Sequence, residues 1–347
     1  MTERKKKKQR TRNRDWERDP DAAYTHDLRR HRRTTGKIKS EPTEQRAIPI
    51  DFEPNGRVVS HTKKYATVQW DGREALCRID EGLNEDRVTL LAPGDRVLVE
   101  KIEDQWMVRA IAPRQTTLSR PGTEGSRIAE QVIAANIDVL VIVVSVAKPR
   151  FKPGLIDRYL ITAQIGGVEP LLCLNKVDLV DGEAAPDVAA YEELGLTIVR
   201  TSCETGEGID ELRAALTGKL SVFAGQSGVG KSSLLNALDP ELDLYTQEVS
   251  DATEKGKHTT TGARAYDLAD DIRVIDTPGI RQLGLAKITE HELAFYFPEL
   301  AERADRCKFR NCTHTHEPDC AICEAVEAGE IPKQRYGSYL RIRESLE

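Results

Sequence analysis

The sequence predicts a multidomain protein with a small β-barrel, an α/β domain and a cysteine-rich helical domain. Three observations predict this organisation. A chain of 347 residues is long for a single hydrophobic core. Short alternating apolar runs come first, and longer apolar runs that alternate with helical patterns follow them. Four of the seven cysteines then crowd near the end of the chain. The predicted divisions are a tail with linker (1–46), a barrel domain (47–116), an α/β domain (117–287) and a cysteine-rich domain (288–347).

The N-terminal tail carries a concentrated positive charge. Residues 1–40 hold 15 Lys or Arg against six Asp or Glu, a net charge of +9, whereas the rest of the chain carries −15. A segment with so few aliphatic residues cannot bury enough apolar surface to offset its ordering entropy, so we expect disorder. The charge favours an arm that binds a polyanion such as RNA, and a solubilising tail is the alternative.

Residues 47–116 contain about five short β-rich runs separated by Gly, Asp and Asn. This pattern predicts a small closed barrel, with the OB-fold as the leading candidate. OB-folds often bind nucleic acids by stacking bases on exposed aromatic rings, and Tyr65, Trp70 and Trp106 could serve. For each of these rings we nevertheless expect packing in the barrel core, which is the commoner role of such residues.

A phosphate-binding motif organises the α/β domain. An apolar run breaks at Gly225, and a helical pattern opens at Lys231. Glycines let backbone N–H groups approach phosphate oxygens, and the helix N-terminus adds its positive dipole end. The motif Gly-x4-Gly-Lys-Ser therefore predicts a nucleoside triphosphate site, with Lys231 on the β- and γ-phosphates and Ser232 on Mg²⁺. The predicted contacts are Gly225, Gln226, Ser227, Gly228, Val229, Gly230, Lys231, Ser232 and Ser233.

The motif NKVD follows another buried-strand pattern, at the sheet edge where open α/β sheets bind ligands. The Asp178 carboxylate can accept hydrogen bonds from the N1–H and the exocyclic amine of guanine, a donor pair that adenine lacks. The Asn175 amide and the Lys176 stem would brace the loop and cover the ring. A further strand pattern ends at Ser202 and Cys203, which join the predicted base site. The predicted nucleotide is GTP.

Two motifs after the phosphate-binding loop predict a switch region. Asp276 begins the sequence DTPG, where its carboxylate would hold the Mg²⁺ sphere and the Gly279 N–H would face the γ-phosphate. A threonine triplet between the two motifs predicts a loop that orders around the triphosphate, although it could be an ordinary polar loop. We choose Thr260 as the Mg²⁺ ligand, with Thr259 and Thr261 as alternatives.

The position after DTPG predicts slow intrinsic hydrolysis. Ras-like GTPases carry a glutamine there that orients the attacking water, but this chain has Ile280. His258 in the threonine loop is the nearest polar group that titrates near neutral pH. Stabilisation of the loop is its alternative role. The predicted catalytic residues are His258, Lys231 and Thr260.

The motifs occur in an unusual order. Ras-like GTPases place the phosphate-binding loop, the switch threonine and DxxG before NKxD, whereas here NKVD comes first. The domain is therefore predicted to be circularly permuted, which is tolerated when the original termini lie close together. The loop after DTPG then leads directly into the C-terminal domain, so a partner of that domain could act on the γ-phosphate sensor.

The C-terminal cysteines follow the pattern Cys-x4-Cys-x-His-x5-Cys. Three thiolates and one imidazole make a closed tetrahedral zinc set, with His316 and Cys323 as spare candidates and a metal-free thiol cluster as the alternative. Helices at 288–297 and 331–346 are expected to give this domain its only core. Zinc is expected to supply much of its folding free energy. The predicted ligands are Cys307, Cys312, His314 and Cys320.

These motifs together resemble the ribosome small-subunit-dependent GTPase A family of circularly permuted bacterial GTPases. The resemblance covers about residues 47–347 and rests on GQSGVGKSSLLNAL, GKHTTT, DTPGI, NKVD and the cysteine-histidine pattern. It implies an OB-fold, a GTPase domain and a zinc domain that clasp the small ribosomal subunit during late maturation, with GTP hydrolysis stimulated by that subunit. The basic N-terminal tail is longer than is usual in this family. The resemblance implies nucleotide and Mg²⁺ contacts at Gly225, Lys231, Ser232, Asn175, Lys176, Asp178 and Asp276, and zinc ligands at Cys307, Cys312, His314 and Cys320.

The predicted function is that of a GTP-hydrolysing assembly factor bound to the small ribosomal subunit and its rRNA. One alternative is a GTP-gated RNA-binding scaffold whose hydrolysis is incidental. The other is a permuted GTPase of the large subunit, against which the barrel and the zinc pattern count. We expect a cytoplasmic monomer without membrane association, because no apolar run approaches the roughly 20 residues of a membrane helix and the N-terminus lacks a signal-peptide core.

Overall fold

A computed structural model describes three folded parts of the chain. The predicted N-terminal tail lies outside the described residues. Within the part of the chain that the structure covers, no helix has the length and apolar character needed to cross a membrane. The described residues are 51–84, 91–121, 130–180, 186–242, 263–276, 285 and 288–346.

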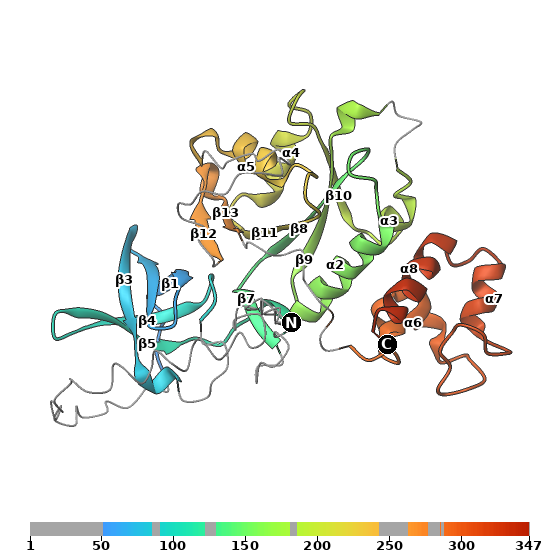
Figure 1. Ribbon diagram of the computed structural model, residues 1–347, viewed down its shortest axis with the longest axis horizontal. Helices are drawn as coiled ribbons and strands as arrows, with labels where there is room; N and C mark the ends of the chain where they lie inside the picture. Colours follow the sequence, from blue (N-terminus) through green and yellow to red (C-terminus); the bar gives the residue numbers. More distant parts are fainter. Residues whose placement is uncertain are drawn as a thin grey trace, which may run out of the picture. The chain divides into compact units, whose positions relative to one another are not determined.

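The first folded part is a closed barrel of five short strands in the order β1-β2-β3-β5-β4 (Figure 1). Strands β3 and β5 pair parallel and the other neighbours pair antiparallel. Val58, Val68 and Val108 fill its interior with none of their surface exposed, so the predicted OB-like barrel is confirmed. The strands are β1 (Gly56–His61), β2 (Tyr65–Trp70), β3 (Arg73–Ile79), β4 (Arg96–Ile102) and β5 (Gln105–Ile111), with a 3-10 turn η3 (Glu81–Asn84).

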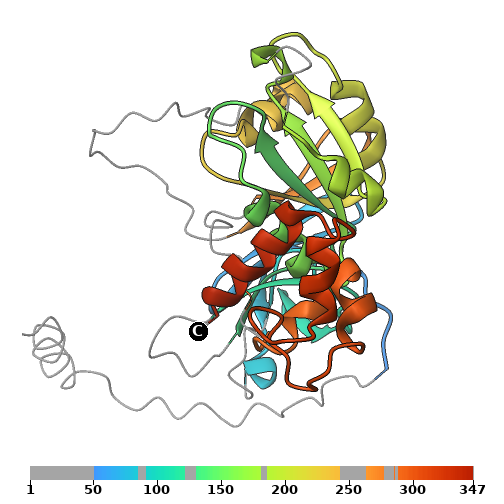
Figure 2. The same ribbon diagram turned by 90° about the vertical axis from the view of Figure 1, so that its right-hand side faces the viewer.

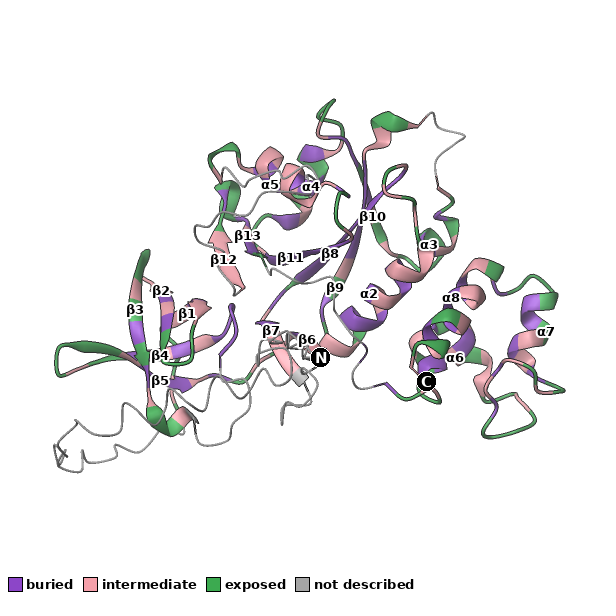
Figure 3. Cartoon of the chain, viewed as in Figure 1, coloured by how far each residue is buried: buried purple, intermediate pink, exposed green. Residues whose placement is uncertain are grey.

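The second folded part is a six-stranded sheet of order β10-β9-β8-β11-β13-β12. Strand β12 runs antiparallel to β13, and the other neighbours pair parallel. All residues of the central strand β8 are buried, as its continuous β-branched run predicts (Figure 3). The strands are β8 (Val139–Ser145), β9 (Glu169–Asn175), β10 (Thr197–Thr201), β11 (Leu220–Ala224), β12 (Arg264–Asp267) and β13 (Arg273–Asp276).

Helices cover both faces of this sheet (Figures 1 and 2). Leu140 and Ile142 of β8 pack in one hydrophobic cluster with α2 and α3, whereas Val141 and Val143 pack in another with α4 and α5. A hairpin that the sequence analysis did not predict precedes the sheet. These elements are β6 (Thr117–Pro121), β7 (Glu130–Ala135), α2 (Pro153–Gly166), α3 (Ala189–Glu193), α4 (Ile209–Leu216) and α5 (Lys231–Leu238).

The third folded part, 288–346, differs from its prediction at one helix. The predicted helix over 288–297 is wrong: a short 3-10 turn forms there, and an α-helix begins at Pro298. The proline ring disfavours helical geometry at Phe297, whose φ of −113° and ψ of 102° are extended, and it suits the first turn of the next helix. The predicted C-terminal helix is confirmed. The elements are η9 (Leu293–Tyr296), α6 (Pro298–Ala304), α7 (Ala321–Glu327) and α8 (Lys333–Glu344).

The hydrophobic core of this third part includes a helix of the α/β domain. Ile161 of helix α2 is buried in the same cluster as Phe297 and Tyr339, and Ile165 packs against that cluster. Helix α8 accordingly lies beside α2 (Figure 1). The expectation that two flanking helices give this domain its only core is therefore wrong, because a helix of the α/β domain completes it.

Candidate functional site

The phosphate-binding motif lies between β11 and α5, at the carboxyl edge of the sheet. Gly225 has a φ of 153° and Gly230 a φ of 101°, values that L side chains rarely adopt. A Cβ at Gly225 would collide with the Val143 carbonyl oxygen, and a Cβ at Gly230 with the Asn175 amide nitrogen. Both positions therefore require glycine, which accounts for the spacing of the motif.

Lys231 begins α5, and the loop holds its ammonium group. Nζ donates hydrogen bonds to the carbonyl oxygens of Gly225 and Gln226, both at 2.9 Å. Burial raises the pKa of the Asp276 carboxyl at the end of β13, and the nearby Lys231 charge counteracts this rise. A cation and a carboxylate thus flank the glycine loop, as Mg²⁺-triphosphate binding requires.

The NKVD motif is hydrogen-bonded to the phosphate-binding loop. Asn175 is buried at the end of β9, where its Nδ2 donates to the Val229 carbonyl at 2.8 Å and its Oδ1 accepts from the Thr201 hydroxyl at 3.1 Å. Lys176 has a φ of 67°, and its Nζ donates to the Gly228 carbonyl at 2.6 Å. These bonds fix the two loops relative to each other.

Asp178 lies exposed in the 3-10 turn η4 (Val177–Leu179). Its Oδ1 accepts a 2.5 Å hydrogen bond from the Ser202 hydroxyl, and Ser202 Oγ in turn accepts from the N–H of Glu204 at 3.2 Å. Half-buried Cys203 follows, and burial together with the charges of Glu204 and Asp178 raises its thiol pKa. Two loops therefore hold the Asp178 carboxylate in an accessible position.

The described residues bring the NKVD side chains, Ser202 and Cys203 to the same sheet edge as the loop 225–233 and Asp276. Within that loop, Ser232 and Ser233 belong to the first turn of α5, and Ser227 lies in the turn before it. The roles of the residues outside the described part stay predictions. Those residues are His258, Thr259, Thr260, Thr261, Gly279 and Ile280.

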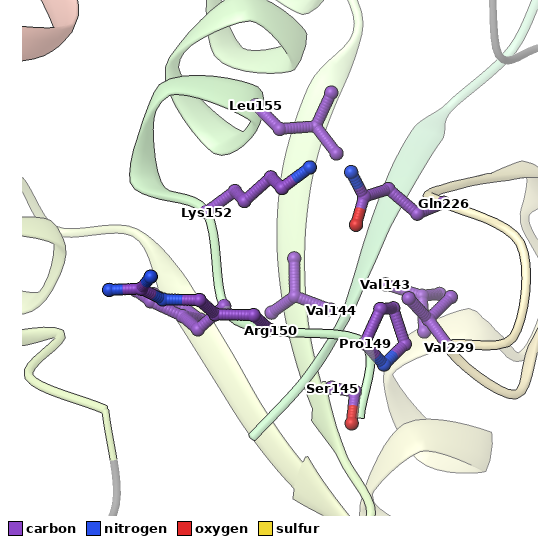
Figure 4. Close-up of a pocket in the computed structure, with 10 residues that line it drawn as sticks. Val143, Val144, Ser145, Pro149, Arg150, Lys152, Leu155, Gln226 and Val229 are labelled. Atoms are coloured by element: carbon purple, nitrogen blue, oxygen red, sulfur yellow. The ribbon is translucent and has the colours of Figure 1, made fainter. Parts of the chain in front are cut away.

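A small pocket that was not predicted from the sequence adjoins the phosphate-binding loop (Figure 4). Lys152 and Leu155, at the start of α2, face Gln226 across it, and Val229 also lines it. The sequence does carry a signal for this pocket, because a basic segment directly follows the apolar run of β8. The start of α2 is thereby adjacent to the loop that is expected to hold phosphates.

The four predicted zinc ligands lie together, with all of their candidate ligand atoms within 4.8 Å of one another. Cys307 Sγ is 3.9 Å from Cys320 Sγ and 3.5 Å from His314 Nδ1, and Cys320 Sγ is 3.7 Å from His314 Nδ1. Tetrahedral zinc with Zn–S bonds of about 2.3 Å and Zn–N bonds of about 2.0 Å gives S–S edges of about 3.8 Å and S–N edges of about 3.5 Å. The donor set therefore fits one tetrahedral ion.

The two spare candidates do not join this group. Cys323 Sγ contacts the Tyr336 hydroxyl at 3.7 Å, and His316 is exposed. Burial raises the thiol pKa of Cys307 and, to about 12, that of Cys312. Because a bound divalent cation deprotonates its thiol ligands, occupation of the site would release protons.

The backbone conformation and the hydrogen bonds that shape the zinc site were not predicted. His314 adopts a left-handed φ of 56°, which makes the one-residue spacing from Cys312 possible. Glu317 accepts hydrogen bonds from the N–H groups of Thr313 at 2.7 Å and Thr315 at 3.1 Å. Burial raises the Glu317 pKa, but these bonds outweigh burial and hold it well below its usual range. The hydroxyl of Tyr336 donates to the His314 carbonyl at 2.8 Å, so a side chain from α8 also fixes this turn.

The barrel aromatics overturn one expectation. Tyr65 is 39% exposed and Trp106 is 36% exposed, so core packing is wrong for both. Tyr65 lies on the outward face of β2, opposite the buried Ala66 and Val68, and Trp106 lies beside exposed Gln105 at the start of β5. Trp70 is half-buried against the core, with its ring 5.1 Å from that of Trp106 in an edge-on contact.

Comparisons with known proteins agree with this geometry. The family model described as RsgA GTPase matches residues 111–286. A Shewanella oneidensis protein named small ribosomal subunit biogenesis GTPase RsgA is 39% identical over 308 residues, which is 85% of this chain and 84% of that protein. A Gemmatimonas aurantiaca protein of the same name is 41% identical over 260 residues, 74% of this chain and 84% of that protein.

Two solved structures share the architecture. The crystal structure of YjeQ from Thermotoga maritima matches with a TM-score of 0.67 and 33% identity over 84% of this chain and 98% of that one. The structure of YloQ, described as a circularly permuted GTPase, matches with a TM-score of 0.63 and 28% identity over 84% and 94%. The order of strands and motifs, the nucleotide-site geometry and these matches lead to one conclusion: the chain belongs to the RsgA GTPase family, whose members are circularly permuted GTP-hydrolysing enzymes.

Proposed function

We propose that this protein is a GTP-hydrolysing assembly factor for late maturation of the small ribosomal subunit, and that the subunit stimulates its GTPase. The observation that carries the proposal is the match, over about three quarters or more of the chain, to curated proteins named small ribosomal subunit biogenesis GTPase. The presence of an OB-like barrel before the GTPase domain and a Cys₃His cluster after it supports the proposal, since a permuted large-subunit GTPase would not need either flanking part.

We assign the nucleotide contacts of the described residues by position in the fold, and those of Thr260 and Gly279 by their sequence motifs. Asn175, Lys176, Asp178, Ser202 and Cys203 hold guanine, and residues 225–233 hold the phosphates. Ser232, Thr260 and Asp276 hold Mg²⁺, and Gly279 faces the γ-phosphate. Zinc is the ion for Cys307, Cys312, His314 and Cys320, where it supplies folding free energy. The proposed domains are 47–116, 117–287 and 288–347, preceded by the basic tail and linker (1–46).

We propose rRNA as the nucleic-acid partner. Tyr65 and Trp106 offer exposed rings on which unpaired bases can stack, each stack being worth about 1–3 kcal/mol. The basic tail would add phosphate contacts whose strength falls with salt. We propose a monomer that works in the cytoplasm, where ribosomal subunits mature.

Multiple-turnover GTP hydrolysis should rise by about tenfold or more when isolated small ribosomal subunits are added, equivalent to lowering the barrier by roughly 1.4 kcal/mol or more. Phosphate release measured with the full chain tests this. Purified large subunits and a Lys231→Ala variant are the controls, and neither should support the stimulated rate. An unchanged rate with small subunits would favour the RNA-binding scaffold, and equal stimulation by large subunits would favour the large-subunit alternative.

His258→Ala should keep GTP affinity and small-subunit binding but lose most of the stimulated rate. With Ile280 unable to orient water, the proposal gives that role to the His258 imidazole once the subunit orders its loop. Single-turnover hydrolysis with and without subunits measures both rates. A stimulated rate within about threefold of wild type, under roughly 0.7 kcal/mol of barrier, would remove His258 from catalysis.

A further inference from the structure

Helix α2 contacts the nucleotide site at its N-terminal end. Lys152, directly before the helix, and Leu155 in its first turn line the pocket that Gln226 and Val229 of the phosphate-binding loop also line (Figure 4). The contact links a helix to the loop across more than 70 residues of sequence. Because the two are closely packed, a shift of the first turn of α2 would displace the phosphate-binding loop.

One turn further on, α2 carries a buried ion pair with the C-terminal part of the chain. Asp157 of α2 pairs with Arg335 of α8, and their side chains are 0% and 3% exposed. Arg335 Nε also donates to a carboxylate oxygen of Glu299 in α6 at 2.5 Å. The guanidinium lies over the ring of Phe297 at 4.7 Å. Arg335 keeps Glu299 as a partner within 288–346, whereas the buried Asp157 carboxylate would lose its cationic partner if the two parts separated, which is costly for a buried charge.

The same network reaches the first residue of α2. Arg335 lies 5.6 Å from the centre of the Tyr191 ring, and the Tyr191 hydroxyl donates to the carbonyl of Pro153 at 3.2 Å. Tyr159 is buried in the second turn of α2 and makes a hydrogen bond with the backbone of Gly225, the first glycine of the phosphate-binding loop. Burial raises the pKa of the Tyr159 hydroxyl, and the hydrogen bond opposes this rise. Helix α2 thus contacts the loop at its N-terminal end and in its second turn.

We propose that α2 is a positioning element for GTP binding: docking of residues 288–346 through the Asp157–Arg335 pair holds the start of α2 against the phosphate-binding loop. GTP binding and this docking therefore strengthen each other. Ile161, which completes the hydrophobic core of 288–346, adds an apolar contact to the same face of the helix. The inference rests on GTP binding alone and is independent of any ribosomal partner.

Asp157→Asn tests the proposal in the full chain. The variant keeps the side-chain volume but removes the charge that faces Arg335, so docking should weaken while zinc content stays at one ion per chain. Affinity for a non-hydrolysable GTP analogue, measured by calorimetry, should fall by about 3–30-fold, the range of measured coupling between distant sites. The matched control is Asp319→Asn, which removes an exposed carboxylate that pairs with Lys308 away from α2 and should leave GTP affinity unchanged.

A second measurement uses the unmodified protein, so the test does not depend on the variant folding. Coupling between GTP binding and docking is reciprocal, and the GTP analogue should therefore slow hydrogen exchange of the α8 amides. Unchanged exchange in α8 on addition of the analogue would overturn the proposal. So would an Asp157→Asn variant whose α8 exchanges faster while its GTP affinity stays within twofold of wild type.

Discussion

Replacing Asp178 by asparagine is expected to weaken GTP binding by about 2–4 kcal/mol, the scale of losing a charged hydrogen-bond pair that the bound base buries. The carboxylate offers only acceptors to the two donors of guanine. In the variant, the Ser202 hydroxyl can still donate to the amide oxygen, as it donates to Asp178 Oδ1 at 2.5 Å, which directs the amide nitrogen toward the base. A donor then faces the exocyclic amine of guanine, whereas the 2-oxo group of xanthine can accept from it.

Isothermal titration with GTP and XTP measures both effects, and the variant should gain affinity for XTP while losing it for GTP. Asp210→Asn is the control, because that carboxylate is fully exposed on α4 and should leave both affinities unchanged. A variant that binds GTP like wild type and gains nothing for XTP would refute the base-pocket assignment.

Replacing Cys312 by serine should remove the metal and unfold much of 288–346. Structural zinc contributes about 10–16 kcal/mol of binding free energy, as much as the whole free energy of unfolding of a typical domain, which is about 5–15 kcal/mol. The zinc content measured by elemental analysis should fall from one ion per chain to none. Amides of α6, α7 and α8 should lose protection from hydrogen exchange. The amides of β8 and β11 should keep theirs, because both hydrophobic clusters of the sheet remain intact.

The matched control is Cys323→Ser. Cys323 lies near the zinc site, but its sulfur contacts the Tyr336 hydroxyl and not the ligand group. This variant should retain one zinc. Loss of zinc from Cys323→Ser together with retention in Cys312→Ser would reassign the ligand set.

Elements defined by local pattern were the ones that the sequence predicted. The β-branched run of β8 is buried on both faces, and the glycine loop joins a strand to a helix at Lys231. Motif order predicted the permutation, since chain order is read directly from the sequence. The cysteine spacing predicted a cluster whose ligand atoms do meet. In each case, neighbouring residues carry most of the information.

One local signal and several long-range contacts were not predicted. Pro298 holds Phe297 extended and starts α6 later than the apolar pattern indicated. Nothing in α2 alone shows that Ile161 and Asp157 face another part of the chain, because an amphipathic pattern does not name the partner of a buried face. Glu317 was not predicted although its partners are close in the sequence, because no side-chain pattern marks a carboxylate that accepts from backbone N–H groups. Tyr65 lies on the outward face of β2, opposite the buried Ala66 and Val68.

The hydrogen bonds between the NKVD motif and the phosphate-binding loop have a consequence for nucleotide exchange. Asn175 and Lys176 bind the carbonyls of Val229 and Gly228 directly, so hydrogen bonds within the protein hold the base loop and the phosphate-binding loop together as one cradle for base and diphosphate. The entropy of ordering this cradle is lost during folding and not during association, which is preorganisation. GDP uses the same cradle as GTP and should bind with comparable strength. Preference for the triphosphate must then arise solely from groups that touch the γ-phosphate.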